Sequence, residues 1–339
     1  MKKLTITFII LDILVAICFF VVYAPPFKTL QYTIISTAVN TKTHDYIAYT
    51  FYSEEHVNKV VSQNNYIPID EEMDLTDIVI DTSPRDHYDN PYDEAILTRD
   101  EGNEDYKYLK IKVGKYDAHL VAIYDPSKVK LVTCKKFNTS DSSGKESVLK
   151  MSKRLGFTVG INGGGFVDYG TGSDIPLGYV IKDGKIIWSK TTGKANLIGF
   201  TNDNKLLLIN ATGEEAINMG MRDALQFGPF LMVNGEQMKF SDSAGGYSRA
   251  ARTAIAQRKD GIVLFLVTEG THTAGPNMKE VIDALSLYGA YNATNLDGGS
   301  STQMVIKGKV VNTPKNIYGQ IINGGKGRNV VTGWGLFTE

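Results

Sequence analysis

The chain has 339 residues, and its 36 basic and 37 acidic side chains leave a formal net charge of -1. This balance lacks the basic excess of a nucleic-acid-binding surface, so we expect no nucleic-acid partner. A hydrophobic content of 42% is enough for one sizeable folded domain together with a membrane anchor.

The N-terminus carries an almost uninterrupted apolar run, Leu4 to Tyr23, after two lysines at positions 2 and 3. Its length is about the 20 residues needed to cross a bilayer core, although Asp12 within it is costly to insert. Lysines before the run predict a cytoplasmic N-terminus and an extracellular remainder. A cleavable signal peptide is the alternative, but Pro25 and Pro26 directly after the run argue against processing. We therefore predict a single-pass protein of a cell membrane, with residues 1–24 as the anchor and the main folded domain outside the cell.

Residues 25–104 differ in character from the rest of the chain. A helical signal covers Ser53 to Ser62, where two glutamates follow a serine that suits the N-cap position. The stretch from Asp70 to Asp105 is acidic and contains two prolines, which is typical of a loose tether. We interpret residues 25–104 as an extracellular linker or stalk, which either reaches across the wall or packs on the domain that follows it.

From about residue 105 the sequence predicts a strand-rich domain. Short β-type runs cover Tyr108 to Val113, His119 to Ile123 and Val129 to Cys134, whereas helical signals are few. We expect an α+β domain over residues 105–339, with mixed, mostly antiparallel sheets and a few helices on their faces, preceded by the transmembrane helix.

The order helix, strand, glycine-rich loop and hairpin occurs twice in this region. The first copy comprises Ser147–Leu155, Phe157–Ile161, Asn162–Phe166 and Tyr179–Ile187, and the second comprises Val281–Tyr288, a short strand, Asn295–Thr302 and Met304–Val311. This repetition predicts two pseudo-repeated halves, with both glycine loops at one cleft between them.

The second glycine loop, Asn295-Leu296-Asp297-Gly298-Gly299-Ser300-Ser301-Thr302, is the most informative stretch of the chain. It places a carboxylate before two glycines and three hydroxyls, the composition of a backbone-lined anion pocket that carries a catalytic acid or base. Asp-Gly-Gly also forms tight turns, but a turn does not need the hydroxyls that follow.

Five ordered motifs lie between about residue 105 and the end of the sequence: Gly160–Phe166, Phe227–Gly235, Ala251–Ala256, Asn295–Thr302 and Gly327–Arg328. In this order they resemble the phosphodiester glycosidase family. The family includes an enzyme that removes N-acetylglucosamine from a sugar phosphodiester, and many bacterial proteins tied to exopolysaccharides. Ser300 stands where many members have a third glycine, a departure that keeps the carboxylate and the backbone donors and bears on which substrate is recognised. The resemblance implies a glycosidase that acts on sugar phosphodiesters.

Cleavage of a sugar-1-phosphodiester at the anomeric carbon requires a carboxylate near that carbon and cationic or N–H donors near the phosphate. Asp297 is the candidate carboxylate, and Arg252 and Arg328 are candidates for the phosphate because a guanidinium grips two oxygens at once. Asn162 is a candidate partner for a sugar hydroxyl or acetamido group, although asparagine before glycine is also a common turn former. The predicted substrate-binding residues are Asn162, Gly163, Gly164, Arg252, Thr253, Gly298, Gly299, Ser300, Ser301 and Arg328.

Glu269 is a second candidate catalytic residue, because the apolar run Ile262 to Val267 predicts a buried strand that ends beside it. The alternative is that Glu269 only caps the following turn. Carboxyl groups of Asp297 and Glu269 about 5 Å apart would favour retention, whereas about 6.5 to 9.5 Å would favour inversion. No histidine and cysteine cluster has metal-ligand spacing, so we expect no cofactor, although the acidic residues could hold a divalent cation.

These observations favour a cell-surface hydrolase that removes an N-acetylglucosamine-like sugar from a sugar-1-phosphodiester in a cell-wall or exopolysaccharide glycopolymer. One alternative is a non-catalytic polysaccharide-binding or assembly factor that keeps the pocket without the reaction. Another is a transferase that passes the sugar to a hydroxyl group in place of water. Substitution of Asp297 by asparagine separates catalysis from binding, because only catalysis should be lost.

Overall fold

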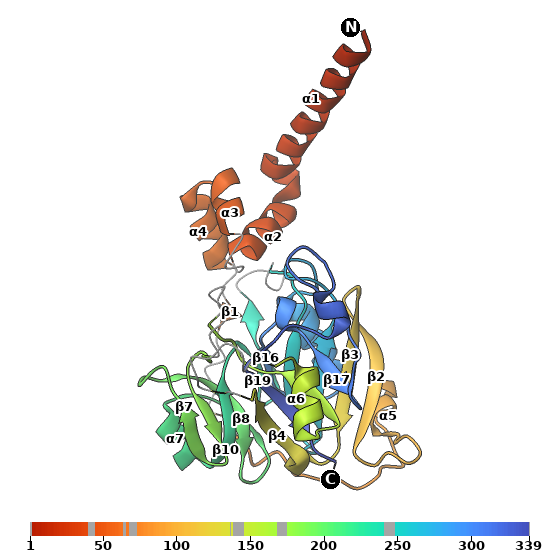
Figure 1. Ribbon diagram of the computed structural model, residues 1–339, viewed down its shortest axis with the longest axis vertical. Coiled ribbons are helices and arrows are strands. Elements are labelled where there is room, and N and C mark those ends of the chain that lie inside the picture. Colours follow the sequence, from red (N-terminus) through yellow and green to blue (C-terminus); the bar gives the residue numbers. More distant parts are fainter. Residues whose placement is uncertain are drawn as a thin grey trace. The chain divides into compact units, whose positions relative to one another are not determined.

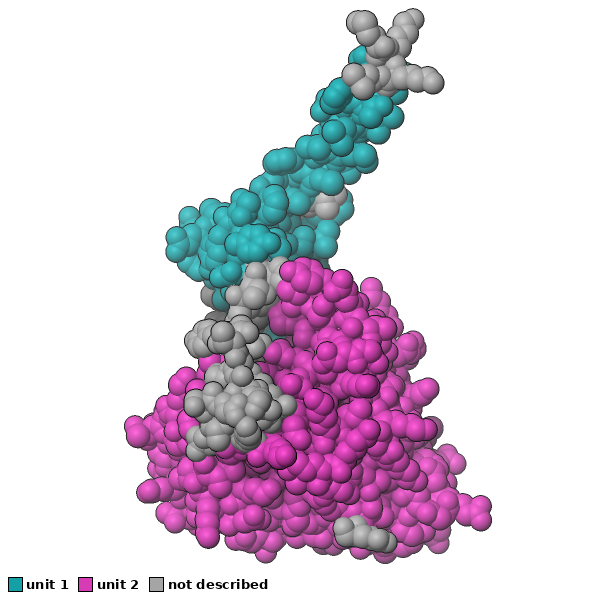
Figure 2. Space-filling model, in the orientation of Figure 1, with its two compact units in different colours: residues 1–66, 240–249 teal, residues 67–239, 250–339 magenta. Residues whose placement is uncertain are grey.

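A computed structural model describes residues 2–39, 45–63, 66–67, 73–135, 137, 146–167, 175–240 and 248–338. The chain divides into two compact units, coloured separately in Figure 2. The helical unit comprises residues 1–66 and 240–249, and the larger unit comprises residues 67–239 and 250–339.

The helical unit contains α1 (Lys2–Tyr23), η1 (Pro25–Phe27), α2 (Lys28–Val39), α3 (Asp45–Phe51) and α4 (Glu54–Gln63). Its small core includes Tyr32, Ile35 and Val57. The predicted helix near residues 53–62 is confirmed as α4, and the Ser53 hydroxyl accepts the His56 N–H at 3.2 Å as an N-cap should.

No helix in the part of the chain that the structure describes is both long enough and apolar enough to cross a membrane. The predicted transmembrane helix is therefore wrong, and so are the predicted membrane partner and the single-pass location with a cytoplasmic N-terminus and an extracellular catalytic domain. The prediction rested on the apolar content of Leu4 to Tyr23 and gave too little weight to Asp12 in the middle of α1. A carboxylate at the centre of a membrane helix costs about 2.5 to 3.5 kcal/mol on insertion scales.

The larger unit combines sheets with short helices, as Figure 1 shows, and every strand pairing with a defined register is antiparallel. The central sheet has the order β12 (Glu236–Gln237), β11 (Phe230–Val233), β16 (Ala290–Leu296), β14 (Thr253–Arg258), β15 (Val263–Thr268), β3 (Tyr116–Ile123) and β2 (Tyr106–Val113). A second sheet has the order β18 (Lys309–Val310), β17 (Met304–Ile306), β5 (Val159–Asn162), β19 (Thr332–Leu336) and β4 (Val129–Thr133). A third has the order β7 (Lys185–Trp188), β6 (Val180–Lys182), β10 (Met221–Gln226), β8 (Ala195–Thr201) and β9 (Leu206–Ala211).

Among the described residues, the helices of the larger unit are α5 (Pro91–Leu97), α6 (Val148–Leu155), α7 (Gly213–Asn218) and α8 (Met278–Leu287), with the short turns η2 (Pro126–Lys128), η4 (Gly299–Ser301) and η5 (Ile322–Gly325). The strands β1 (Tyr66–Ile67) and β13 (Lys239–Phe240) lie where the chain passes from one unit to the other. The α+β class with antiparallel sheets thus agrees with the prediction, apart from the transmembrane helix.

The predicted order of elements recurs in the structure: α6, β5, a glycine loop and the hairpin β6–β7, then α8, β16, a glycine loop and the hairpin β17–β18. The two copies nevertheless distribute their strands differently, because β5 lies in the second sheet and β16 in the central sheet. The hairpin of the second copy returns to the first, since Met304 of β17 pairs with Ile161 of β5. This crossing brings the segment after one glycine loop beside the strand before the other.

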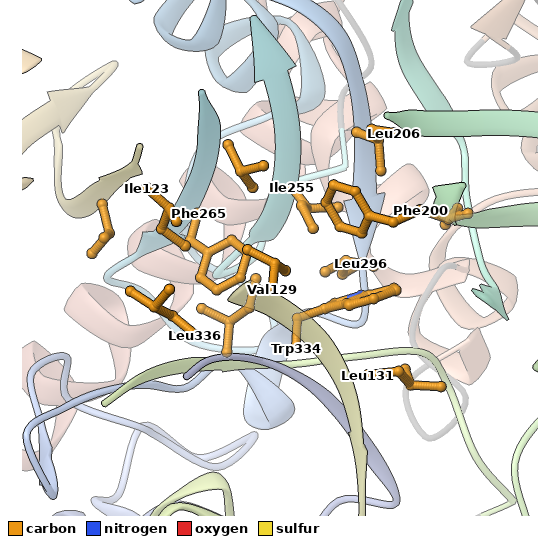
Figure 3. Close-up of a cluster of buried hydrophobic side chains, with 14 of the residues drawn as sticks. Ile123, Val129, Leu131, Phe200, Leu206, Ile255, Phe265, Leu296, Trp334 and Leu336 are labelled. Atoms are coloured by element: carbon orange, nitrogen blue, oxygen red, sulfur yellow. The ribbon is translucent and has the colours of Figure 1, made fainter. Parts of the chain in front are cut away.

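The main core lies where the three sheets meet (Figure 3). The central sheet contributes Ile255 and Phe265, β19 contributes Trp334, and β8 contributes Phe200. The rings of Phe200 and Trp334 pack edge to face, with centroids 5.5 Å apart and an interplanar angle of 78°. Burial of such rings contributes about 25 cal/mol of free energy per Å² of apolar surface removed from water. This packing holds the three sheets together and so fixes the positions of the strand ends.

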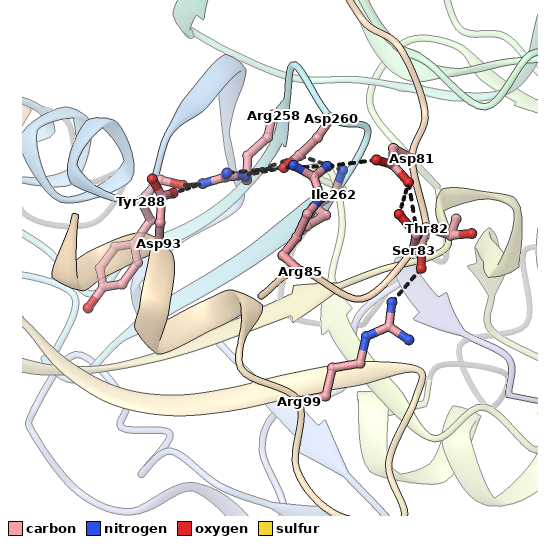
Figure 4. A network of polar contacts seen from close by, with 10 residues as sticks. All are labelled: Asp81, Thr82, Ser83, Arg85, Asp93, Arg99, Arg258, Asp260, Ile262 and Tyr288. Atoms are coloured by element: carbon pink, nitrogen blue, oxygen red, sulfur yellow. Dashed lines mark hydrogen bonds and ion pairs between the residues drawn. The ribbon is translucent and has the colours of Figure 1, made fainter. Parts of the chain in front are cut away.

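Residues 73–104, which we call the strap, pack on the larger unit and belong to it. Ile78 is 1% exposed, and the Val79 N–H donates to the Lys259 oxygen at 2.8 Å. An ion-pair network follows in Figure 4, where Arg258 lies 2.7 Å from Asp93 and 3.0 Å from Asp260. By these contacts the strap is part of the larger unit. The functional division between residues 25–104 and 105–339 stays a prediction.

Candidate active site

The two glycine loops are joined through one buried side chain, that of Asn162 at the end of β5. Its Nδ2 donates to the Asp297 backbone oxygen at 2.6 Å, while its Oδ1 accepts from Thr253 Oγ1 at 2.8 Å and from the Gln303 N–H at 3.0 Å. A second link runs between the loops, from the Asp297 N–H to the Gly163 oxygen at 3.0 Å. The structure therefore brings Asn162, Thr253 and Asp297 together, as the motifs predicted. Because Asn162 is 1% exposed and bound to protein groups, its predicted contact with substrate stays a prediction.

Close backbone packing explains the glycines of the loops. A Cβ on Gly298 would lie 2.7 Å from the Ala251 oxygen, and one on Gly163 would lie 2.7 Å from Thr332 Oγ1. The neighbouring Gly164 donates its N–H to the same Thr332 hydroxyl at 3.1 Å. These contacts leave no room for a side chain, so the glycines are required by the protein itself, whatever they also contribute to a ligand.

Asp297 is half-buried and directly follows β16, and η4 starts two residues later. The turn is closed by the Ser301 N–H, which donates to the Gly298 oxygen at 3.1 Å. Ser300 and Ser301 are buried at 8% and 2% exposure, so most of their surface faces protein. The carboxylate is thus held by a rigid turn, while the predicted substrate contacts of the two serines stay predictions.

Glu269 follows β15, so its placement at a strand end is confirmed. Its Oε1 accepts the Thr313 N–H at 2.9 Å and lies 3.2 Å from His119 Nε2. Burial alone raises the pKa of this carboxyl, but the hydrogen bonds from His119 and Thr313, with the charges of His119 and Lys315, outweigh it and hold the pKa below its usual value. The side chain is 22% exposed, so an ionised carboxylate remains accessible.

Two connections tie the Glu269 region to the Asp297 loop. On one side, the residue before Thr313 is Asn312, whose Nδ2 donates to the Thr302 oxygen at 3.0 Å. On the other side, Ala251 donates its N–H to the Thr271 oxygen and accepts the Gly299 N–H, both at 2.8 Å. Both candidate carboxylates therefore belong to one hydrogen-bonded assembly of loops.

The two candidate arginines lie in different surroundings. Arg252 is 8% exposed, and its Nε donates to the Pro276 oxygen at 3.4 Å. Arg328 is half-buried, with its guanidinium carbon 5.0 Å from the ring centroid of Phe166, the residue that ends the first glycine loop. Arg252 directly precedes Thr253, and Gln303 Nε2 donates to the Arg328 backbone oxygen at 2.9 Å, so both arginines adjoin the Asn162 cluster.

A family model described as phosphodiester glycosidase matches residues 156–337, which is more than half of the chain. The chain belongs to the phosphodiester glycosidase family. The resemblance inferred from the ordered motifs is thereby confirmed, and the site described above lies almost wholly within the matched residues.

Relatives of this chain include YomE, a prophage-derived uncharacterized protein of Bacillus subtilis. It is 29% identical over 184 residues, which cover 50% of this chain and 28% of the relative. A mouse protein named N-acetylglucosamine-1-phosphodiester alpha-N-acetylglucosaminidase is 25% identical over 170 residues, covering 45% of this chain and 32% of the relative. The matches thus span about a third or less of these relatives. One similar solved structure is the catalytic domain of the zebrafish protein of that name, auto-inhibited by its pro-peptide. It matches with a TM-score of 0.57 at 20% identity, and the match covers 69% of this chain and 83% of that one. This likeness shows the fold.

Sequence reasoning missed the residues that surround the two candidate carboxylates. Gln303 links Asn162 to Arg328, and His119 contacts Glu269 from β3. The sequence contains one signal for His119, an imidazole at the start of an apolar strand run, but the pairing of β3 with β15 that brings it to Glu269 could not be read from it. Within the described residues no group of three or more histidine, cysteine, aspartate or glutamate side chains is arranged to hold a metal ion. The expectation that no cofactor is needed stays a prediction.

Proposed function

We propose that this phosphodiester glycosidase hydrolyses the bond between the anomeric carbon of an N-acetylglucosamine-like sugar and the phosphate of a sugar-1-phosphodiester in a glycopolymer. The observation that carries the proposal is the Asn162 junction, which holds the Asp297 carboxylate loop against the first glycine loop in a member of this family. The name of the mouse relative supports the choice of sugar and of linkage.

The proposed chemistry assigns a role to each charged group. Departure of the phosphate leaves an oxocarbenium-like centre at the anomeric carbon, which Asp297 or Glu269 would stabilise or attack. The contacts that keep Glu269 ionised support a role as base or nucleophile, because an acid must carry its proton at the start of the reaction. Arg252 and Arg328 would bind the phosphate oxygens, whose charge grows as the bond breaks. Phosphate is a good leaving group, so the reaction depends less on a strong general acid than ordinary glycoside hydrolysis does.

The test is release of free sugar by the full chain from N-acetylglucosamine-1-phosphodiesters and from UDP-N-acetylglucosamine. Asp297→Asn should reduce kcat roughly 10³-fold or more, while the control Asp283→Asn, on the exposed side of α8, should retain full activity. Sugar transferred to an added alcohol in preference to water would favour the transferase alternative. Binding without turnover of any donor would favour the non-catalytic alternative and contradict the proposal.

A further inference from the structure

Three side chains lie in a row behind the accessible end of Glu269. The Tyr108 hydroxyl, on β2, is 2.8 Å from His119 Nδ1, on β3, and His119 Nε2 is 3.2 Å from Glu269 Oε1. The tyrosine and imidazole rings are parallel, with an interplanar angle of 3° and centroids 6.0 Å apart. His119 is 5% exposed, whereas Tyr108 is half-buried on β2, the edge strand of the central sheet, so the row runs from the edge strand through a buried imidazole to the carboxylate.

The chemistry of the groups fixes the direction of these hydrogen bonds. An ionised carboxylate only accepts, so His119 Nε2 carries its hydrogen and donates it to Glu269. In the neutral imidazole Nδ1 is then an acceptor, and the Tyr108 hydroxyl donates to it. In the protonated imidazole both nitrogens donate and the Tyr108 oxygen accepts. In both states Glu269 Oε1 receives two N–H groups, from His119 and from Thr313.

This arrangement distinguishes the two oxygens of Glu269. Oε1 is occupied by its two donors, whereas Oε2 has no hydrogen-bond partner among the described residues. The carboxylate plane is fixed by the two bonds to Oε1, so Oε2 has a defined direction. A reacting carboxylate needs such fixation, because an error of about 1 Å in its position can cost on the order of 10²-fold in rate.

We propose that His119 and Tyr108 are positioning residues that hold Glu269 as an oriented anion and leave Oε2 for the anomeric carbon or the attacking water. This inference rests on the proposed function and names the residues that prepare its second carboxylate. If the bond from His119 to Glu269 served only to stabilise the fold, its removal would lower stability without moving the acid limb of the pH profile of kcat.

Other charged groups also act on this row. Lys315 lowers the pKa of Glu269, and Asp117, whose backbone oxygen accepts the Glu269 N–H at 2.7 Å, adds a nearby negative charge on β3. Lys110 and Lys112, on β2, lie close enough to lower the pKa of Asp117. These groups are unchanged by substitution of His119, so the contribution of His119 can be measured against a constant background.

The test compares His119→Phe, which removes the donor, with His119→Gln, whose side-chain amide can replace the Nε2–H. With the full chain and a sugar phosphodiester that the wild type cleaves, His119→Phe should lower kcat roughly 10- to 100-fold, the loss expected when one hydrogen bond to a charged group disappears. KM should change little, and the acid limb of the pH profile should move to higher pH. His119→Gln should recover most of kcat and return the acid limb toward its original position.

A readout independent of turnover separates this inference from the proposed function. The titration of the Glu269 carboxyl carbon can be followed by ¹³C NMR and assigned by its disappearance in Glu269→Gln. Its midpoint should rise in His119→Phe, and an unchanged midpoint would overturn the inference even if the enzyme is active. A wild type without turnover would instead reject the proposed function, while the NMR midpoint still decides on His119. If His119→Phe does not fold, Tyr108→Phe, which removes one hydroxyl, replaces it, and the same midpoint should rise.

Discussion

The side-chain nitrogen of Asn162 lies 2.6 Å from the backbone oxygen of Asp297. The first residue of the first glycine loop thus holds the second glycine loop, which carries the candidate carboxylate. The same asparagine accepts two further hydrogen bonds, from Thr253 and Gln303. Its amide thus connects β5, β14 and the segment after η4 through one buried group. The position of the candidate carboxylate therefore depends on a residue that is itself almost inaccessible.

Asn162→Ala should lower both stability and activity. The substitution leaves buried donors and acceptors of Thr253, Gln303 and Asp297 unpaired, which should reduce the free energy of unfolding by about 1 to 3 kcal/mol. Urea unfolding measures this loss, and kcat/KM measures the displacement of Asp297. The matched control is Asn210→Ala, which removes the exposed hydrogen bond from Asn210 to Asn196. It should change the free energy of unfolding by no more than about 0.5 kcal/mol. Equal effects of the two substitutions would show that the junction has no special role.

Gly298→Ala should disturb the carboxylate loop without removing any functional group. The added Cβ would lie 2.7 Å from the Ala251 oxygen, so the loop must move, at a cost of about 1 to 3 kcal/mol. Because Asp297 directly precedes this residue, we expect kcat/KM to fall at least roughly 10-fold. The control is Gly193→Ala, where a Cβ would meet only Thr191 Oγ1 at 3.8 Å, and thermal unfolding should barely change. A variant of Gly298 with wild-type activity would show that the loop tolerates displacement.

The Asp297 loop and its partners could be predicted because their chemistry is local in the sequence. The helix ends before the glycine loops follow from capping residues, such as Ser147 and Gly156 at the two ends of α6. The carboxylate before two glycines can be read directly from the second motif. The repeated order of elements also predicted that the two loops would meet, which the Asn162 junction confirms.

The environment of Glu269 could not be predicted, because it depends on strand pairing between distant segments. His119 reaches Glu269 only because β3 pairs with β15, in a register that places His119 opposite Val267. Membership of the strap in the larger unit likewise depends on Arg258, whose partner Asp93 lies far away in the sequence. The transmembrane prediction failed for a different reason, since it weighed apolar length above the charge of Asp12.

Asp93→Asn should destabilise the larger unit strongly. Asp93 and Arg258 are both 11% exposed at the side chain, and removal of one partner leaves the other charge buried and undercompensated. Such a loss typically costs about 3 to 5 kcal/mol, although Asp260 remains beside Arg258 and should place the result near the lower end. The control is Asp283→Asn, which breaks the exposed pair with Lys279 and should cost less than about 1 kcal/mol. Similar unfolding midpoints in urea for both variants would show that the strap contributes little to stability.

Glu269→Gln should remove a pH-dependent part of the stability of the larger unit. The pKa of Glu269 is held below its usual value in the folded protein: burial opposes this shift, and the hydrogen bonds from His119 and Thr313, with the charges of His119 and Lys315, outweigh it. The ionised carboxylate therefore contributes stability that is present above the unfolded pKa, about 4.3, and is lost as the pH falls through the lower folded pKa. Glutamine cannot titrate, so the stability advantage of the wild type over the variant should shrink as the pH is lowered from about 7 into this acidic range. Urea unfolding of both proteins at a series of pH values measures the difference. An advantage that stays constant, or grows with acidity, would mean that the bonds from His119 and Thr313 do not favour the anion.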